Sequence, residues 1–150
     1  MNIKQFFIAT MAMLTFSVAA TADDYTHSML AVQGYDVVSY QTEKQPVRGN
    51  GNFTASYEGV DYQFSSKANL ETFEVSPKKY APAYGGFCAY GAALGKKFIG
   101  DPEIWRVVDG TLYLNLDADI QDKWVKDVPG HIKLADAKWK EIKDKSPASL

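Results

Sequence analysis

The sequence predicts a small single α+β domain with two β-hairpins and several short helices, ending in two helices. Two observations lead to this fold class. Apolar and polar residues alternate on either side of two short turns, as they do in half-buried strands. Other segments repeat apolar residues at helical spacing. With 150 residues, 46% of them hydrophobic, the chain is long enough for one core, and no repeat or linker divides it.

The first hairpin is predicted around Glu58-Gly59. Residues 53–57 and 60–64 alternate apolar and polar side chains on either side of this dipeptide. A two-residue turn there places six apolar side chains on one face of the hairpin as facing pairs. The expected pairs are Tyr57 with Val60, Ala55 with Tyr62, and Phe53 with Phe64.

The second hairpin is predicted around Asp109-Gly110, a dipeptide that suits the positive φ angles of a type I′ turn. The resulting register leaves Arg106 and Tyr113 on one face and four apolar residues on the other. The apolar pairs are Val107 with Leu112 and Trp105 with Leu114.

Two helical segments are expected between the hairpins. Ser66 can cap a helix that runs through Phe73, because its hydroxyl can accept hydrogen bonds from the free amides of the first turn. After Ser76, Pro77 suits the first position of a further helical turn.

Two helices are expected after the second hairpin. Asp117 can cap the first of them, and we expect Pro129-Gly130 to separate it from the last helix. Residues 145–150 are expected to fray. The apolar face of the last helix consists of Ile132, Ala135, Trp139 and Ile142.

Residues 1–22 have the features of a cleaved signal peptide. Lys4 precedes an apolar stretch over residues 6–16, and Ala20 and Ala22 are the small residues that a signal peptidase recognises. The stretch is shorter than the roughly 20 residues of a membrane-spanning helix, although an uncleaved tether is the alternative. We expect a mature domain of residues 23–150 in a bacterial periplasm, with no membrane span after cleavage.

The charge balance argues against nucleic acid as a partner. The chain has 16 Lys and Arg residues against 18 Asp and Glu residues, and no basic stripe. The cysteine count also excludes several kinds of site, because one cysteine cannot form an intrachain disulfide, a CxxC redox pair or an all-cysteine zinc site. Any cysteine chemistry therefore involves Cys88.

Cys88 lies in the least ordinary stretch of the chain, a glycine- and tyrosine-rich segment over residues 84–97. If a helix begins just after Gly86, the thiol lies in its first turn, where the unpaired amides and the helix dipole favour the thiolate. This position suits a metal ligand or a nucleophile. The alternative is a small residue buried in the core, as free cysteines often are.

A soft-metal site is one hypothesis for Cys88. His27, Met29 and His131 are the candidates to complete it, and a set of Cys, His and Met ligands suits Cu(I). The two histidines lie near the two ends of the mature chain, and the ends of small domains often lie close together. The alternative is that His131 lies at a helix N-terminus for local reasons and that His27 belongs to a mobile leader.

A tyrosine-lined cleft is the second hypothesis. Nine tyrosines are many for this length, and buried hydroxyl groups need partners. Tyr35, Asp36, Tyr84 and Tyr90 are the candidates to line such a cleft for a small molecule or a partner. Asp36 has the alternative role of accepting backbone hydrogen bonds in a turn or helix cap.

Short motifs follow one another along residues 31–140, namely Gly34-Tyr35-Asp36, Ser76-Pro77, the segment from Tyr84 to Gly91, and Asp109-Gly110. Together they resemble the motifs of exported bacterial YHS-domain proteins. The resemblance implies a link to metal handling, because the wider YHS group includes modules attached to copper-transporting ATPases. It also assigns the thiol of the glycine-rich motif to Cys88. This chain has Ser65-Ser66 where the wider group carries cysteines after a Tyr-Phe strand.

The leading hypothesis is a periplasmic protein that binds or carries copper through Cys88, with His27, Met29 or His131 completing the site. The first alternative is a binding module without metal, in which Cys88 belongs to the core. A thiol-dependent enzyme with His131 as the base is the third, and it requires the two side chains within about 3 to 4 Å of each other.

Overall fold

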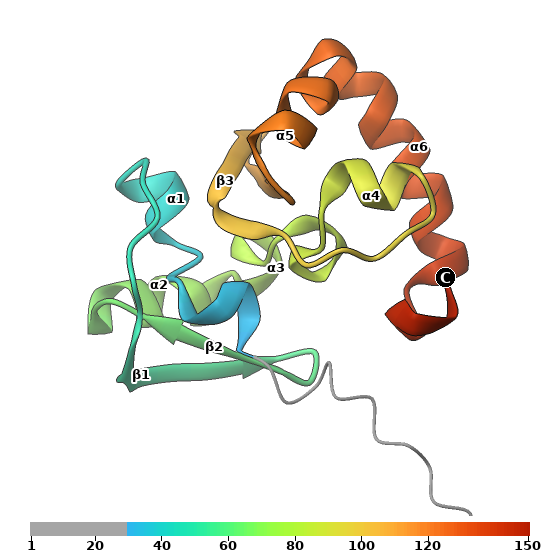
Figure 1. Cartoon of the computed structure of the whole chain (residues 1–150). Helices are drawn as coiled ribbons and strands as arrows, with labels where there is room; N and C mark the ends of the chain where they lie inside the picture. The colour runs from blue at the N-terminus through green and yellow to red at the C-terminus, as the bar shows by residue number, and fades with distance from the viewer. Residues whose placement is uncertain (1–29) are drawn as a thin grey trace, which may run out of the picture.

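The computed structural model describes residues 30–150. Two antiparallel two-stranded sheets and a series of mostly short helices confirm the predicted α+β class (Figure 1). Within this range, no helix is long and apolar enough to cross a membrane. The strands are β1 (Asn50–Tyr57), β2 (Val60–Phe64), β3 (Asp101–Val108) and β4 (Thr111–Asn115). The α-helices are α1 (Ser39–Thr42), α2 (Lys67–Val75), α3 (Pro77–Tyr80), α4 (Ala89–Ala93), α5 (Ala118–Trp124) and α6 (Val128–Ile142), and the 3-10 helices are η2 (Ala31–Gly34), η3 (Ala83–Gly86), η4 (Val125–Asp127) and η5 (Pro147–Ser149).

The β1–β2 hairpin forms around the predicted turn, and two of its three predicted pairs are confirmed. These are Tyr57 with Val60 and Ala55 with Tyr62. The pairing of Phe53 with Phe64 is wrong, because the register shifts between Asn50 and Thr54 and Phe64 pairs with Asn50 instead. Extra residues in one strand displace every later pair, and alternation alone does not reveal such a bulge.

The β3–β4 hairpin has the predicted register throughout its last four pairs. Asp109 and Gly110 take φ angles of +49° and +76°, as a type I′ turn requires. Arg106 pairs with Tyr113, and the predicted apolar pairs on either side of it are confirmed.

The predicted helix starts are confirmed where a side chain caps the helix. The Ser66 hydroxyl accepts from the Asn69 amide at 3.2 Å before α2, and the Asp117 carboxylate accepts from the Ile120 amide at 2.8 Å before α5. Pro77 occupies the first turn of α3.

The predicted break at Pro129-Gly130 is wrong, because both residues belong to the first turn of α6. The helix is capped earlier, by the Asp127 carboxylate, which accepts from the Gly130 amide at 3.0 Å. Proline fits there because the first helical amides have no partner within the helix. The chain end is also more ordered than expected, since η5 forms within the segment that was expected to fray.

The β3–β4 hairpin separates the buried residues into two clusters. Alternate residues of a strand point to opposite faces, so Leu112 and Leu114 enter the first cluster while Tyr113 enters the second. Residues 31–40, the β1–β2 hairpin and α2 supply most of the first cluster, and α4, α5 and α6 supply most of the second. Both clusters therefore depend on the same hairpin for their packing.

Tyr62, which belongs to the first cluster, is expected to make the fold less stable at alkaline pH. Its side chain is 6% exposed, and burial raises the pKa of its hydroxyl from 10.0 to about 12. Because this pKa is higher in the folded state, the stabilisation is complete below pH 10 and is lost as the pH rises from about 10 to 12. We expect Tyr62 to account for a loss of about 1.4 kcal/mol in unfolding free energy at pH 11. Urea unfolding at pH 8 and 11 measures it, and Tyr62→Phe should lose that much less than the native chain; equal losses would contradict the prediction.

Candidate functional site

Cys88 is the residue that immediately precedes α4. Its thiol is 1% exposed, and its sulfur accepts a hydrogen bond from the Gly91 amide at 3.4 Å. The Cys88 amide donates to the Phe98 carbonyl at 2.8 Å, and its backbone forms a bridge with Leu114 of β4. The structure thus places Cys88 one residue before the helix rather than in its first turn, and encloses the thiol.

Asn115 provides the polar neighbour of the thiol. The Cys88 thiol donates to Asn115 Oδ1 at 3.7 Å, and the Asn115 side chain is itself fully buried. Among the described residues, no acceptor lies within hydrogen-bond reach of Asn115 Nδ2. A half-turn of this amide would present Nδ2 to the sulfur, which accepts as well as donates. The thiol therefore lies beside a buried polar group with unused hydrogen-bonding capacity.

The segment 94–100 covers this pair. Phe87 forms a backbone bridge with Ile99, and the Gly100 amide donates to the Gly86 carbonyl at 3.2 Å. Leu94, Phe98 and Ile99 expose much of their side chains to solvent from this segment. The segment that lies against Cys88 is therefore held in place by backbone hydrogen bonds.

The enclosed thiol is expected to react slowly with iodoacetamide. Modification requires local opening of the 94–100 segment, so we expect a rate at least about a hundredfold below that of the urea-unfolded chain. A Leu116→Cys variant in a Cys88→Ala background supplies an exposed reference thiol. Similar rates for Cys88 and Cys at position 116 in the native state would contradict the burial.

The structure does not join His131 to the thiol. His131 Nδ1 lies 2.9 Å from the Trp124 carbonyl, and the ring meets Tyr90 edge-on with 5.1 Å between centroids. No hydrogen bond links His131 to Cys88, whose sulfur is hydrogen-bonded to the Gly91 amide and to Asn115 Oδ1. The arrangement therefore lacks the thiol-base contact that a cysteine-dependent enzyme needs.

The donor set of the described residues does not by itself fit a copper site. No group of three His, Cys, Asp or Glu side chains in residues 30–150 is placed to hold a metal ion. His131 is the one histidine in this range, and its Nδ1 is engaged by a carbonyl. His27 and Met29, the other predicted ligands, lie outside the described residues.

Tyr35 contacts charged groups rather than an apolar cleft. Its hydroxyl donates to Glu103 Oε1 at 2.7 Å, and the Arg48 guanidinium lies 4.2 Å from the centre of its ring. The hydrogen bond to Glu103 is the main reason that the pKa of Tyr35 is raised.

Asp36 has the structural role that the sequence offered as its alternative. It is fully buried, and its carboxylate accepts four hydrogen bonds. Only one of these bonds is local, from the Val38 amide at 2.9 Å. The other three come from the Ser65 amide and hydroxyl and from Asn69 Nδ2, at 2.7 to 2.8 Å.

Tyr84 and Tyr90 belong to the second cluster. The Tyr84 hydroxyl donates to Asp136 Oδ1 at 2.9 Å, and burial followed by this hydrogen bond raises its pKa. Tyr90 packs its ring against His131. None of the four residues predicted to line a cleft, which are Tyr35, Asp36, Tyr84 and Tyr90, lines either of the hollows described next.

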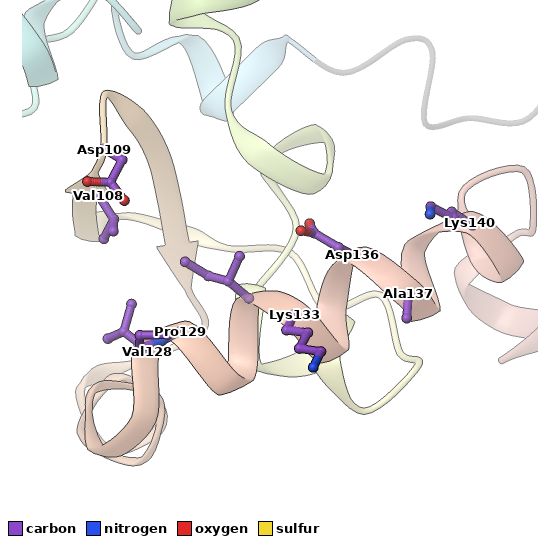
Figure 2. A pocket seen from close by; sticks show the side chains of 9 residues that line it. Val108, Asp109, Val128, Pro129, Lys133, Asp136, Ala137 and Lys140 are labelled. Carbon is purple, nitrogen blue, oxygen red and sulfur yellow. The ribbon is translucent and has the colours of Figure 1, made fainter.

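The first hollow lies between the β3–β4 turn and α6 and encloses about 450 Å³. Figure 2 shows Val108 and Asp109 on one side of it and the α6 residues Lys133 and Asp136 on the other. Acidic and basic side chains both line this hollow. It therefore has no clear preference for one class of charged ligand.

The second hollow, here called the Trp105 hollow, encloses about 690 Å³ beside β3 and is open to solvent. Its lining combines aromatic, amide and cationic side chains without an acidic one. Sequence reasoning missed this hollow because its residues come from three separate segments that no single motif joins. The one available hint was Arg106 beside Trp105 on a predicted strand. The lining residues are Tyr40, Gln41, Lys44, Trp105, Arg106, Val107 and Gln121.

Comparison with known families adds one finding. Residues 38–84 match the YHS domain family model. The YHS match includes α1, the β1–β2 hairpin, α2 and α3, so it confirms this part of the resemblance. It covers three residues of the Trp105 hollow, namely Tyr40, Gln41 and Lys44, and it ends four residues before Cys88. No curated protein and no solved structure matches the chain.

Proposed function

We propose that the chain is a binding module whose Trp105 hollow takes an anionic small molecule or partner. The observation that carries the proposal is the presence of two exposed cations, Lys44 and Arg106, beside an aromatic wall in a hollow without acidic lining residues. Ligand sites commonly combine such apolar surfaces with a few polar groups that fix orientation.

The two cations are available to a ligand. Neither Lys44 nor Arg106 forms an ion pair with a residue in the described part of the chain, where the ion pairs involve other lysines. A guanidinium binds carboxylate or phosphate groups through two parallel hydrogen bonds, which are stronger than bonds between neutral groups. An anion in the hollow therefore gains interactions that the protein alone does not supply.

The rest of the hollow is held in place by contacts within the fold. Trp105 packs edge-on against Tyr40, with ring centroids 5.2 Å apart, and the Tyr40 hydroxyl donates to the Pro102 carbonyl at 3.0 Å. Gln41 Nε2 donates to the Gly110 carbonyl at 2.9 Å, and Gln121 Nε2 donates to the Trp105 carbonyl at 3.2 Å. Such a wall is preformed, which lowers the entropy cost of binding.

Fragment binding followed by ¹⁵N NMR tests the proposal on residues 23–150. We expect carboxylate and phosphate fragments to shift the Trp105 indole and the Arg106 and Gln121 amides, whereas matched neutral and cationic fragments leave them unchanged. Arg106→Gln should weaken anion binding at least tenfold. Lys126→Gln removes an exposed cation outside the hollow and is the matched control. Equal shifts by cationic fragments, or no shifts at the hollow, would refute the proposal.

Copper handling through Cys88 is the second candidate. The YHS match supports it, and so does the chemistry of the one thiol of the chain, because a thiolate suits Cu(I). Because the described donors do not complete a copper site, this candidate requires a further ligand from His27 or Met29. Titration with Cu(I) should then show binding that weakens at least tenfold in Cys88→Ala and in a His27→Ala, Met29→Ala double variant. Equal binding by all three proteins would end the copper hypothesis.

Export to a bacterial periplasm is part of the proposal. It is supported by the Lys4 charge, the apolar stretch over residues 6–16 and the small residues before Asp23. The expected result is a mature N-terminus at Asp23 in protein from the periplasmic fraction of a bacterial host. Recovery of the full-length chain in a membrane fraction would favour an uncleaved tether instead.

A further inference from the structure

We propose that the outer edge of β3, inside the Trp105 hollow, accepts an extended acidic peptide as a third strand. The inference rests on the proposed function, because it assigns a partner class to the same hollow. It adds a backbone recognition mode that anion binding alone does not require.

The register of the hairpin determines which backbone groups of β3 face outward. In a two-residue hairpin the residues that flank the turn, here Val108 and Thr111, form a hydrogen-bonded pair. Every second pair is then non-hydrogen-bonded, so Trp105 and Val107 direct their amides and carbonyls away from β4. The hydrogen bond from Gln121 Nε2 to the Trp105 carbonyl confirms this direction.

Only some of the outward backbone groups of β3 have a hydrogen-bond partner within the fold. Apart from the Gln121 contact, the outward amide of Trp105 and both outward groups of Val107 have no hydrogen-bond partner among residues 30–150. Upstream on the same strand, Tyr40 donates to the Pro102 carbonyl, and Gln33 donates to the Gly100 carbonyl just before β3. The edge is therefore covered by side chains up to residue 102 and open within the hollow.

An open strand edge in a hollow is a template for an added strand. Exposed strands are usually protected from pairing by bulges, charges or coverage. Here the edge carries Arg106, with Lys44 lining the same hollow. Two uncompensated cations beside free amide and carbonyl groups select a strand with acidic side chains.

The same charges disfavour a second copy of the chain as the partner. Two-fold pairing of β3 centred on Arg106 would bring two guanidinium groups together, with both Lys44 side chains close by. Like charges facing each other across strands are destabilising. An acidic segment of another chain would place negative charges beside Arg106 and Lys44. We therefore assign the edge to an acidic peptide from a different protein.

Fluorescence anisotropy with a labelled acidic peptide of sequence Thr-Glu-Val-Glu-Val-Glu tests the proposal on residues 23–150. A matched peptide with N-methyl groups on every peptide nitrogen keeps every side-chain charge but has no peptide N–H left to pair as a strand. A second matched peptide has Lys in place of Glu. We expect both to bind at least tenfold more weakly than the parent. A charge exchange completes the design, because Arg106→Glu should weaken the acidic peptide and strengthen the Lys peptide.

The outcomes separate this inference from the proposed function. If anionic fragments bind at the hollow but the N-methylated and parent peptides bind equally, strand addition is overturned and anion binding stands. If neither fragments nor peptides bind, both the proposed function and strand addition are overturned. Val107→Pro removes an outward amide and leaves the β3–β4 ladder intact, so it should weaken peptide binding at least tenfold more than it weakens fragment binding. Concentration-dependent self-association without peptide would assign the edge to a second copy and overturn the choice of partner.

Discussion

Replacing Asp36 with alanine is expected to lower the free energy of unfolding by about 3 kcal/mol or more. The carboxylate is fully buried and is the acceptor for four donors. Alanine leaves those donors without a partner and also leaves a small void. A buried donor without a partner costs about 1 to 3 kcal/mol. The effect is therefore large even if the chain relaxes around part of the gap.

The position of Asp36 explains why this loss should be global. Its bond to Val38 orders the start of α1, and its bonds to Ser65 and Asn69 hold that start against the end of β2 and the first turn of α2. The first cluster is built from these same elements. Removing the carboxylate thus separates the segments that bring the first cluster together.

Chemical unfolding of three variants measures the effect. Asp36→Asn retains an acceptor oxygen and should fall between the native chain and Asp36→Ala. Asp119→Ala removes an exposed carboxylate on α5 and should change stability by no more than about 0.5 kcal/mol. If Asp36→Ala matched Asp119→Ala, the hydrogen bonds of the buried carboxylate would be energetically neutral and the structural role would be wrong.

Asp36 also shows how far local sequence rules reach. A turn or cap role for this aspartate follows from its neighbours, and the Val38 bond confirms it. The bonds from Ser65 and Asn69 join positions 29 and 33 residues away. Such contacts depend on how hairpins and helices pack, so no periodicity in the chain indicates them. The hairpin registers and the caps at Ser66 and Asp117, by contrast, depend on a few adjacent residues and were predictable.

The same distinction explains the outcome for the candidate sites. Cys88 was identifiable because it is the one thiol and lies in an unusual glycine-rich segment. Its burial was one of the two alternatives that the sequence left open, because the cover comes from the 94–100 segment folding back on it. The Trp105 hollow needs α1, β3 and α5 side by side, and no pattern in the sequence joins these three segments. Residue type thus identified the candidate thiol, and tertiary packing decided its accessibility.

Gly100→Ala tests the packing around the thiol and is expected to destabilise the fold by about 2 kcal/mol or more. A Cβ at this position would lie 2.5 Å from Leu114 Cβ and 2.7 Å from the Gly86 carbonyl oxygen. The φ angle of Gly100 is not positive, so the cost is steric rather than conformational. The backbone oxygen cannot move without separating η3 from β3.

The same substitution should expose the thiol. The segments that Gly100 holds together also enclose Cys88, which bridges Leu114. We therefore expect faster iodoacetamide labelling of Cys88 together with a lower midpoint of urea unfolding. Gly51→Ala is the matched control, because a Cβ there meets no atom within 4 Å, and it should change neither quantity appreciably. Equal stability of the two alanine variants would show that Gly86 and Leu114 can move away from position 100 without cost. The cover over Cys88 would then open more readily than its hydrogen bonds indicate.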